Sequence, residues 1–206
     1  MKEIKMFYYI NEIFYSIQGE GSWVGTPVIF IRLAGCNLSC KWCDTLHNPK
    51  YFEEEEWILH ELAQYPCNKV VLTGGEPLNQ NLDPLLAALH FAGYSIHLET
   101  NCTLPLPSIA FDWIVASPKY IEGLNFQTLD QANDIKIVCG SEYWKELTEV
   151  VNKKYKKCKG KKHLYLMPLD LKSRENDYFI ATAYDYVKAN PWWKLCAQIQ
   201  KYYNFK

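Results

Sequence analysis

Three cysteines lie close together in the sequence with the spacing Cys36-x3-Cys40-x2-Cys43. They follow the apolar run 27–33, which predicts a buried strand, so Ala34-Gly35 would deliver the thiols to a loop at its carboxyl end. Three thiolates can hold three irons of a cubane cluster and leave the fourth iron open, whereas an electron-transfer cluster normally takes four cysteines. An open iron binds a ligand, so this spacing predicts a metal cluster that takes part in chemistry.

A zinc site is the main alternative for these thiols. His47 lies four residues beyond Cys43 and would complete a tetrahedral set of three cysteines and one histidine. Structural zinc knuckles, however, usually pair Cys-x2-Cys units in small domains that lack a strong core. Here the thiols follow a strand in a chain long enough to build its own core, so the spacing favours the cluster and leaves zinc open.

The elements that must position this loop alternate between strands and helices. Apolar, β-rich runs predict strands over 28–33, 69–73, 95–99, 113–116, 135–139, 163–167 and 194–199. Helices are expected over 53–65, 84–92, 141–155 and 175–189, the second with Asp83 as N-cap and Pro84 at the first helical position.

Strands that alternate with helices predict an α/β fold with parallel βαβ units. A closed eight-stranded barrel needs more strands than this chain of 206 residues offers. We therefore expect one domain over residues 1–206, a partial, open (β/α) barrel of about six parallel strands with an N-terminal strand or hairpin extension at 8–18. Ligands of such folds bind at the carboxyl ends of the strands.

Composition excludes several classes of protein. The net charge of -1 gives no general attraction to nucleic acid or to an acidic membrane surface. No apolar stretch approaches the ~20 residues of a membrane span, and the start carries no signal-peptide pattern, so a cytoplasmic protein is expected. In a reducing compartment the scattered cysteines are expected to be buried or incidental thiols; they are Cys67, Cys102, Cys139, Cys158 and Cys196. The seven lysines of 152–162 are expected to form a solvated helix end and turn, with a phosphate-binding or partner-binding patch as the alternative.

The cysteine spacing, with aromatic Trp42 before the last thiol, resembles the signature of the radical S-adenosylmethionine (SAM) superfamily. A second match is Thr73-Gly74-Gly75-Glu76-Pro77, a strand end followed by a turn in which two glycines let a ligand approach the backbone. In that superfamily the open iron chelates the methionine moiety of SAM, and the glycine turn binds its amino group.

Other motifs resemble one branch of the superfamily, which makes 7-carboxy-7-deazaguanine for queuosine biosynthesis. The matching segments run nearly end to end, and the most discriminating are Ile17-Gln18-Gly19-Glu20-Gly21 and Cys43-Asp44-Thr45. Others are Glu99-Thr100-Asn101, Ala116-Ser117-Pro118-Lys119, Met167-Pro168-Leu169-Asp170 and the tail from Trp193 to Lys201.

The resemblance implies roles for individual residues. Cys36, Cys40 and Cys43 would ligate a [4Fe–4S] cluster and Thr45 a Mg²⁺ ion, which takes few protein ligands. Arg32 offers a planar fork suited to a carboxylate, and its apolar strand disfavours an ordinary salt bridge. The residues that the resemblance implies for SAM binding are Trp42, Gly75, Ser117, Pro118, Lys119, Met167, Pro168, Leu169 and Asp170. Those that it implies for substrate binding are Ile17, Gln18, Gly19, Arg32, Thr73 and Lys206.

The reaction implied is the radical conversion of 6-carboxy-5,6,7,8-tetrahydropterin into 7-carboxy-7-deazaguanine with loss of ammonia, with SAM regenerated. The resemblance also implies a homodimer and an external electron donor, a flavodoxin or ferredoxin. Two alternatives remain: a glycyl-radical enzyme activating protein, which needs a protein partner, and a non-catalytic zinc or iron–sulfur binding module.

Two residues depart from the pattern of this branch. Cys102 stands where a glycine is expected after Glu99-Thr100-Asn101, which puts the geometry of that turn in question. Met167 precedes Pro168 where glutamine is frequent, so a contact there would come from the backbone.

Overall fold

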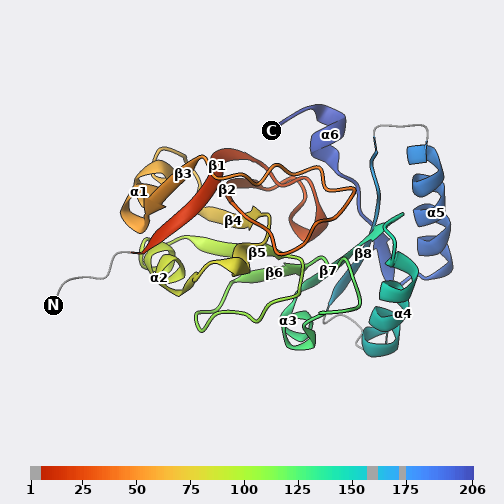
Figure 1. The fold of residues 1–206 in the computed structure, drawn as a ribbon. Coiled ribbons are helices and arrows are strands. Elements are labelled where there is room, and N and C mark those ends of the chain that lie inside the picture. The colour runs from red at the N-terminus through yellow and green to blue at the C-terminus, as the bar shows by residue number, and fades with distance from the viewer. Residues whose placement is uncertain (1–5, 157–161, 172–174) are drawn as a thin grey trace.

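The computed structural model describes residues 6–156, 162–171 and 175–206. Figure 1 shows a sheet with helices packed along its outside. The strands are β1 (Phe7–Ile17), β2 (Pro27–Leu33), β3 (Tyr51–Glu54), β4 (Lys69–Gly74), β5 (Ser95–Thr100), β6 (Trp113–Ala116), β7 (Asp134–Cys139), β8 (His163–Pro168) and β9 (Trp193–Leu195). The helices are α1 (Glu55–Leu62), α2 (Asp83–Phe91), α3 (Phe126–Gln131), α4 (Trp144–Tyr155), α5 (Glu175–Ala189) and α6 (Ile199–Tyr203), with short 3-10 turns η1 (Gly21–Trp23) and η2 (Pro77–Asn79).

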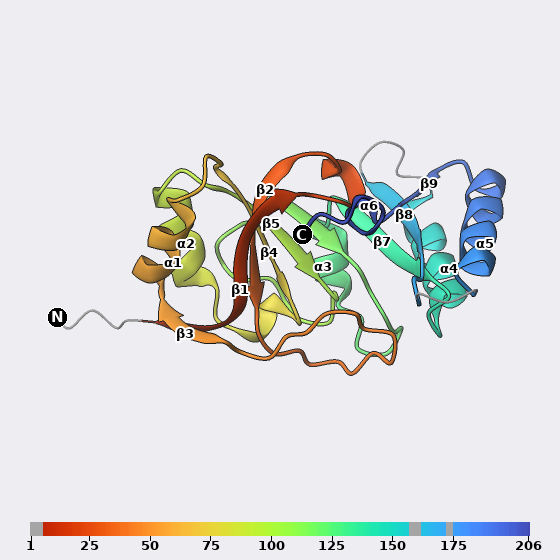
Figure 2. The same cartoon turned by 90° about the horizontal axis from the view of Figure 1, so that it is seen from above.

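The described strands form one sheet in the order β3-β1-β2-β4-β5-β6-β7-β8-β9. From β2 to β9 every neighbouring pair is parallel, while β1 pairs antiparallel with both β2 and β3. Figure 2 shows α1 and α2 near one end of the sheet and α4 and α5 near the other. The two end strands, β3 and β9, do not pair with each other, so the barrel is open. The predicted α/β class, partial barrel and N-terminal strand are confirmed.

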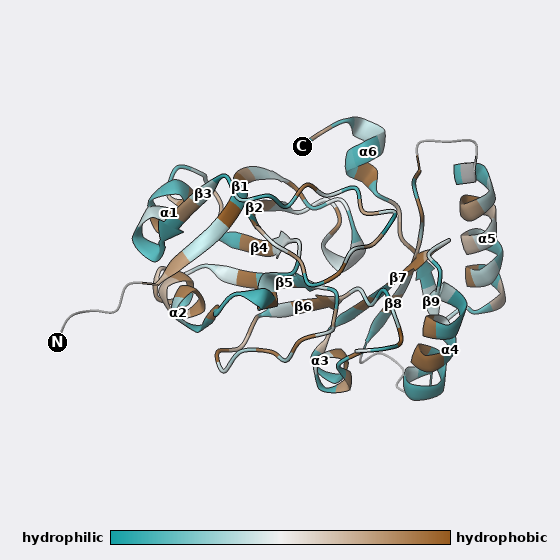
Figure 3. Cartoon of the chain, in the orientation of Figure 1, coloured by the Kyte–Doolittle hydropathy of each residue, from teal (hydrophilic) through white to brown (hydrophobic). Residues whose placement is uncertain are grey.

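Strands β2 and β7 give alternate residues to two different environments. On β7, Ile135 and Ile137 belong to the main apolar core, whereas Lys136 between them lines a cavity on the concave face. On β2, Ile31 packs into the core and Arg32 faces that cavity. Brown and teal bands alternate on α2, α4 and α5 in Figure 3, as expected of helices with one buried side. The sheet therefore has a dry outer face under the helices and a polar inner face.

The sequence misplaced the start of the first helix. Glu53 and Glu54 belong to β3, whose backbone pairs with Phe7 and Tyr8, and the helix begins at Glu55. Phe52 stacks near Phe7 and Tyr9, with ring centroids 5.0 and 4.6 Å apart. These contacts with β1 are distant in sequence, so local propensity could not predict β3.

Two further predictions of local structure were wrong. The last strand ends at Leu195 rather than at residue 199, and α6 begins at Ile199. Asp83 is the first residue of α2 rather than its N-cap, and its Oδ1 accepts a hydrogen bond from the Ile109 N–H at 2.8 Å. The strand over β8 and the helix over α5 appear where they were expected.

Some expectations fall outside the described residues. Cys158 and part of the lysine-rich stretch lie in the segment 157–161. The other seven cysteines are unpaired thiols, and Cys102, Cys139 and Cys196 are buried as expected. Within the described chain, no helix has the length and apolar character needed to cross a membrane.

His97 on β5 is a buried group whose protonation should cost stability. Its side chain is 3% exposed, its ring meets Trp23 edge-on, and no described residue hydrogen-bonds its Nε2. Burial lowers the pKa of His97 to about 4, a shift that Asp112 opposes and Lys69 reinforces.

We predict that the folded state loses stability as pH falls from about 6.5, the pKa of an unfolded histidine, toward the folded value. The total loss should be about 3 kcal/mol, measured by urea denaturation across this range. The variant His97→Phe should flatten this slope, and His60→Gln, on an exposed part of α1, should leave it unchanged. Equal slopes for wild type and His97→Phe would contradict the assignment.

Candidate active site

A large cavity opens at the carboxyl ends of the parallel strands, with a volume of about 730 Å³. This size is typical of small-molecule sites. Residues from β1, β2, β4, β5, β7 and β8 and from the cysteine loop all contribute to it. The structure brings together these residues of the predicted sites: Ile17, Gln18, Gly19, Arg32, Cys36, Cys40, Trp42, Cys43, Thr45, Thr73, Gly75, Ser117, Lys119, Met167 and Lys206.

The cysteine loop is fixed to the glycine turn by direct backbone contact. The Gly75 N–H donates to the Leu33 carbonyl at 3.2 Å, and the Glu76 N–H donates to the Gly35 carbonyl at 2.9 Å. A β-carbon at Gly75 would lie 2.0 Å from the Gly35 oxygen and 2.8 Å from Cβ of Cys36. Glycine is therefore required at position 75 for the turn and the cysteine loop to meet.

The three thiols border one cavity and influence one another electrostatically. Burial raises the pKa of the Cys36 thiol, the Leu38 N–H opposes this, and the neighbouring Glu76, Cys40 and Cys43 raise it further. Three such thiolates need a strongly cationic partner, which suits an iron–sulfur cluster. Among the described residues, no three histidine, cysteine or acidic side chains lie close enough together to hold a single metal ion. His47 also lines the cavity.

Glu76 anchors the turn from inside the protein. Its carboxylate is fully buried and accepts hydrogen bonds from the Thr100 hydroxyl at 2.9 Å and from the Asn101 N–H at 2.7 Å. Burial raises the pKa of Glu76, and these donors partly offset the effect.

Cys102, which follows Asn101 in the chain, has a φ of 64°. The left-handed geometry that suits glycine is therefore present with cysteine in its place, at a cost of about 1–2 kcal/mol.

The residues expected to hold SAM divide into two groups. Lys119 donates to the Ser117 hydroxyl at 2.6 Å and lies 5.3 Å from the centre of the Trp42 ring, at the cavity wall. Burial lowers the pKa of Lys119 to about 8, and the positive charge of Lys136 adds to this. Four other residues of the predicted set are not among the residues that line the cavity: Pro118, Pro168, Leu169 and Asp170.

A buried ion-pair network on the inner face was not predicted. Nζ of Lys136 lies 2.5 Å from Glu20 Oε2 and 3.0 Å from Glu99 Oε2, and all three side chains line the cavity. Burial opposes ionisation of Glu20, but Lys136 and two glutamine amides outweigh it and hold its pKa at about 2. Burial raises the pKa of Glu99 despite Lys136. Lys136 is a charged residue inside the otherwise apolar run 135–139, and this position could have indicated a buried ion pair from the sequence alone.

The C-terminal segment closes one side of the cavity through polar contacts. The amides of Gln198 and Gln200 donate to Glu20 Oε1 at 2.9 and 3.0 Å. A β-carbon at Gly19 would lie within 2 Å of Gln200 Oε1, so the glycine admits this side chain. Nζ of Lys201 lies 2.7 Å from Asp44 and 3.3 Å from Asp170. This lysine links the cysteine loop to the loop after β8.

Arg32 corrects one expectation. It lines the cavity as predicted, but its Nε also donates to Glu12 Oε1 at 2.9 Å, so it is in an ion pair after all. The apolar strand around Arg32 concealed this partner, which lies on the antiparallel strand β1.

The neighbourhood of Thr45 is polar and open to solvent. Its hydroxyl lies 3.5 Å from Asp44 Oδ1, the carboxylate that also binds Lys201. Thr45 therefore offers one hydroxyl oxygen to the cavity, and the carboxylate of the adjacent Asp44 is already paired with Lys201.

The chain is similar in sequence and structure to characterised proteins. Residues 30–176 match the model of the radical SAM superfamily. The 7-carboxy-7-deazaguanine synthase of Burkholderia multivorans is 34% identical over 221 residues, covering 97% of this chain and 99% of that protein. The synthase of Bacteroides thetaiotaomicron is 46% identical over 129 residues, covering 63% and 69%. The crystal structure of QueE from Escherichia coli superposes with a TM-score of 0.78 and 29% identity over 94% of each chain.

The chain therefore belongs to the radical SAM superfamily and, within it, to the family of 7-carboxy-7-deazaguanine synthases. Membership of the superfamily implies a [4Fe–4S] cluster and SAM. The three thiols on one cavity wall, next to a glycine turn, fit these groups.

We predict that Gly75→Ala separates the cysteine loop from β4. The clash is with backbone atoms that have no rotamer to change, so the cost should be about 3 kcal/mol. Iron and sulfide per chain after anaerobic reconstitution should fall several-fold. Gly93→Ala is the matched control, because no atom lies within 4 Å of its β-carbon position although its φ is positive. Full iron loading of Gly75→Ala would contradict the prediction.

We predict that Lys136→Met destabilises the protein by about 3–5 kcal/mol, because it leaves two buried carboxylates without their cation. Denaturant unfolding measures this loss. Lys154→Met, which breaks an ion pair on the surface, should cost less than about 1 kcal/mol. The double variant Lys136→Met, Glu20→Gln should recover part of the loss. If it proves as unstable as the single variant, the buried charge is not the cause.

Proposed function

We propose that this protein is a radical SAM enzyme that converts 6-carboxy-5,6,7,8-tetrahydropterin into 7-carboxy-7-deazaguanine with loss of ammonia. The observation that carries the proposal is one cavity that joins the three cysteines, the glycine turn and Arg32. The family supports the same product, because its members are named 7-carboxy-7-deazaguanine synthases.

In the proposed site, Cys36, Cys40 and Cys43 hold the cluster and the Gly75 backbone meets the amino group of SAM. When bound, the cluster and SAM would supply the radical chemistry of the reaction, which is hydrogen abstraction from the pterin carbon bearing the carboxylate. Lys119 lies at the wall beside Trp42, where its charge suits the carboxylate of SAM. The segment after β8 is fixed to the end of β7, since the Leu169 N–H donates to the Cys139 carbonyl at 2.8 Å.

The pterin is expected between Arg32 and the network around Lys136. The Arg32 guanidinium suits the substrate carboxylate. Carboxylates of Glu20 and Glu99 accept hydrogen bonds, as the N–H groups of the pterin's aminopyrimidinone edge require. Gln200 Oε1 is buried, and no described residue donates a hydrogen bond to it. An N–H of the substrate would satisfy this acceptor. Ile17, Gln18, Gly19 and Thr73 complete the cavity wall around that position.

Magnesium, the electron donor, the cellular location and the assembly are parts of the same proposal. Thr45 would give Mg²⁺ one protein oxygen, with waters and the substrate carboxylate filling the octahedron. A flavodoxin or ferredoxin would supply electrons. The unpaired state of the seven described cysteines supports a reducing cytoplasm. A homodimer without nucleic-acid or membrane partners is expected.

Anaerobic turnover tests the proposal. Protein reconstituted with iron and sulfide should convert the carboxypterin with SAM, Mg²⁺ and a reductant, without any added protein, and the deazaguanine is identified by mass. Failure without a protein substrate would favour the glycyl-radical activating alternative. Zinc without iron, together with failed reconstitution, would favour the binding module.

We predict that Cys40→Ala abolishes turnover. Arg32→Gln should raise KM for the carboxypterin about 10- to 100-fold, since a hydrogen bond to a charged group contributes about 1.5–3 kcal/mol. Steady-state kinetics measures both effects, and Glu149→Ala, on the exposed face of α4, is the control. Unchanged KM in Arg32→Gln would place the substrate carboxylate elsewhere.

A further inference from the structure

β1 contains an irregularity beside the active site. Its pairing with β2 runs Ile10 to Leu33 and then Glu12 to Arg32, so Asn11 is an extra residue on β1. Residues two apart on a regular strand point to the same face. Here Ile10 is fully buried in the outer core, whereas Glu12 lines the cavity on the inner face. The bulge at Asn11 therefore turns Glu12 toward the cavity, as bulges next to active sites do.

The bulge is fixed to the segment that follows the cysteine loop. The Asn11 side chain is buried and donates to the Asn48 carbonyl at 2.6 Å. The Lys50 N–H donates to the Ile10 carbonyl at 2.8 Å. The side chain of Glu12 thus projects from β1 at a fixed position, close to the loop that carries Cys43 and Thr45.

Both oxygens of Glu12 bind a cation. Oε1 accepts from Arg32 Nε at 2.9 Å, and Oε2 lies 3.1 Å from Nζ of Lys206. Burial alone would raise the pKa of Glu12, but hydrogen bonds from these two cations outweigh it and lower the pKa. Glu12 therefore stays ionised at neutral pH.

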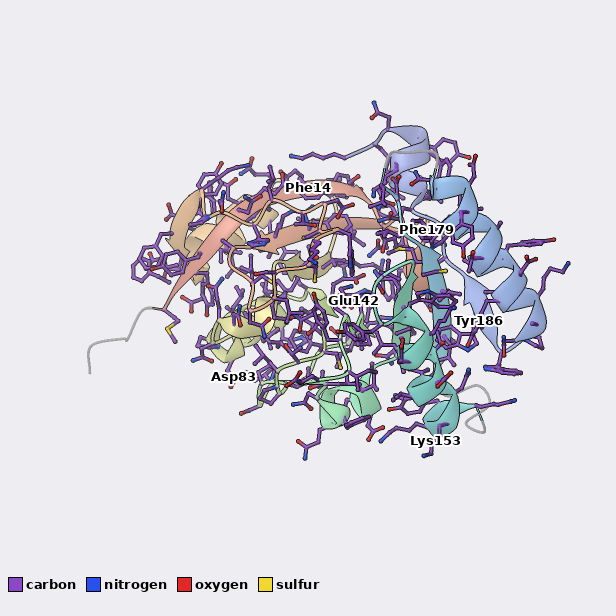
Figure 4. All side chains as sticks on the ribbon, turned by 45° about the vertical axis from the view of Figure 1, so that its right-hand side comes forward. Phe14, Asp83, Glu142, Lys153, Phe179 and Tyr186 are labelled. Carbon is purple, nitrogen blue, oxygen red and sulfur yellow. The ribbon has the colours of Figure 1, made fainter. Side chains whose placement is uncertain are left out.

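Phe14 forms the floor beneath the two cations. The Arg32 guanidinium lies 5.7 Å from the centre of its ring and the Lys206 ammonium 4.8 Å. Phe14 itself stacks on Phe30 at 4.9 Å. Figure 4 shows Phe14 on β1 just beneath the C-terminal segment.

Two side-chain cations surround the one side-chain carboxylate of Glu12, so the side chains of this cluster carry one net positive charge. Among the described residues, Arg32 makes its side-chain hydrogen bond through Nε alone. Its two Nη groups are left for another acceptor. A guanidinium held through Nε presents its opposite edge in a fixed direction, which lowers the entropy cost of binding a second carboxylate.

We propose that Glu12 is a positioning residue that orients Arg32 and Lys206 to recognise a single carboxylate on the substrate. The inference rests on the proposed function and deepens it, because it identifies what gives the site its preference for a carboxylated pterin. Glu12 acts through the two cations and does not itself touch the substrate.

The test measures binding rather than turnover. Calorimetry with the reconstituted protein and SAM compares two non-reacting ligands, oxidised 6-carboxypterin and uncharged 6-hydroxymethylpterin. Wild type should prefer the carboxylate. Glu12→Ala should bind 6-carboxypterin at least 10-fold more weakly and 6-hydroxymethylpterin within 2-fold of wild type. Glu12→Gln, which keeps one accepting oxygen for Nε, should lie between them. Glu149→Ala removes the same charge at a distant, exposed site and should match wild type.

The outcomes separate the two claims. If wild type binds neither pterin, the proposed function fails. If wild type prefers the carboxylate and Glu12→Ala keeps that preference, the inference alone is overturned. Equal weakening of both ligands in Glu12→Ala would also overturn it, because that result indicates a general structural role. In turnover, the supporting result is a rise in KM for the carboxypterin with kcat within about 3-fold of wild type, an effect of about 1.4 kcal/mol per tenfold in KM.

Discussion

Charge balance on the inner face of the sheet is the condition on which the rest of the structure depends. Parallel strands covered by helices can bury apolar residues on one face only if the alternating residues on the other face are satisfied. Lys136 lies between Glu20 and Glu99, and Glu12 lies between Arg32 and Lys206. Each of these charges thus has an opposite partner. This balance lets an open barrel hold a polar heterocycle beside an apolar core.

The second constraint is the contact between the cysteine loop and β4. β2 and β4 are parallel neighbours with Leu33 opposite Gly74, so the loop after one strand and the turn after the other must leave the sheet at the same place. Two consecutive glycines let these backbones touch, and Glu76 fixes the turn to β5 through Thr100 and Asn101. The geometry of the cysteines therefore depends on three adjacent strands rather than on the loop alone.

Much of this could be predicted from local sequence. The buried strands and the thiol loop have strong periodic or spacing signals, and the left-handed turn at Cys102 is formed even without glycine. The parts that were missed depend on contacts between distant segments. β3 and α6 are short and are held by β1 and by the cavity rim, and the partner of Arg32 lies on another strand behind a bulge. Lys136 was the exception, since a charged residue within an apolar strand could be seen in the sequence and was not used to predict its ion pairs.

Helix α6 has a consequence for handling the protein. None of its described side chains is buried, and the segment around it is held over the cavity by hydrogen bonds and by the ion pairs of Lys201 with Asp44 and Asp170. These ion pairs are partly open to solvent, and they weaken as dissolved salt shortens the Debye length, to about 3 Å at 1 M ionic strength. Concentrated salt should therefore favour an open mouth of the cavity, and dilute buffer a closed one. Crystals grown from ammonium sulfate and from polyethylene glycol are expected to capture different positions of this helix.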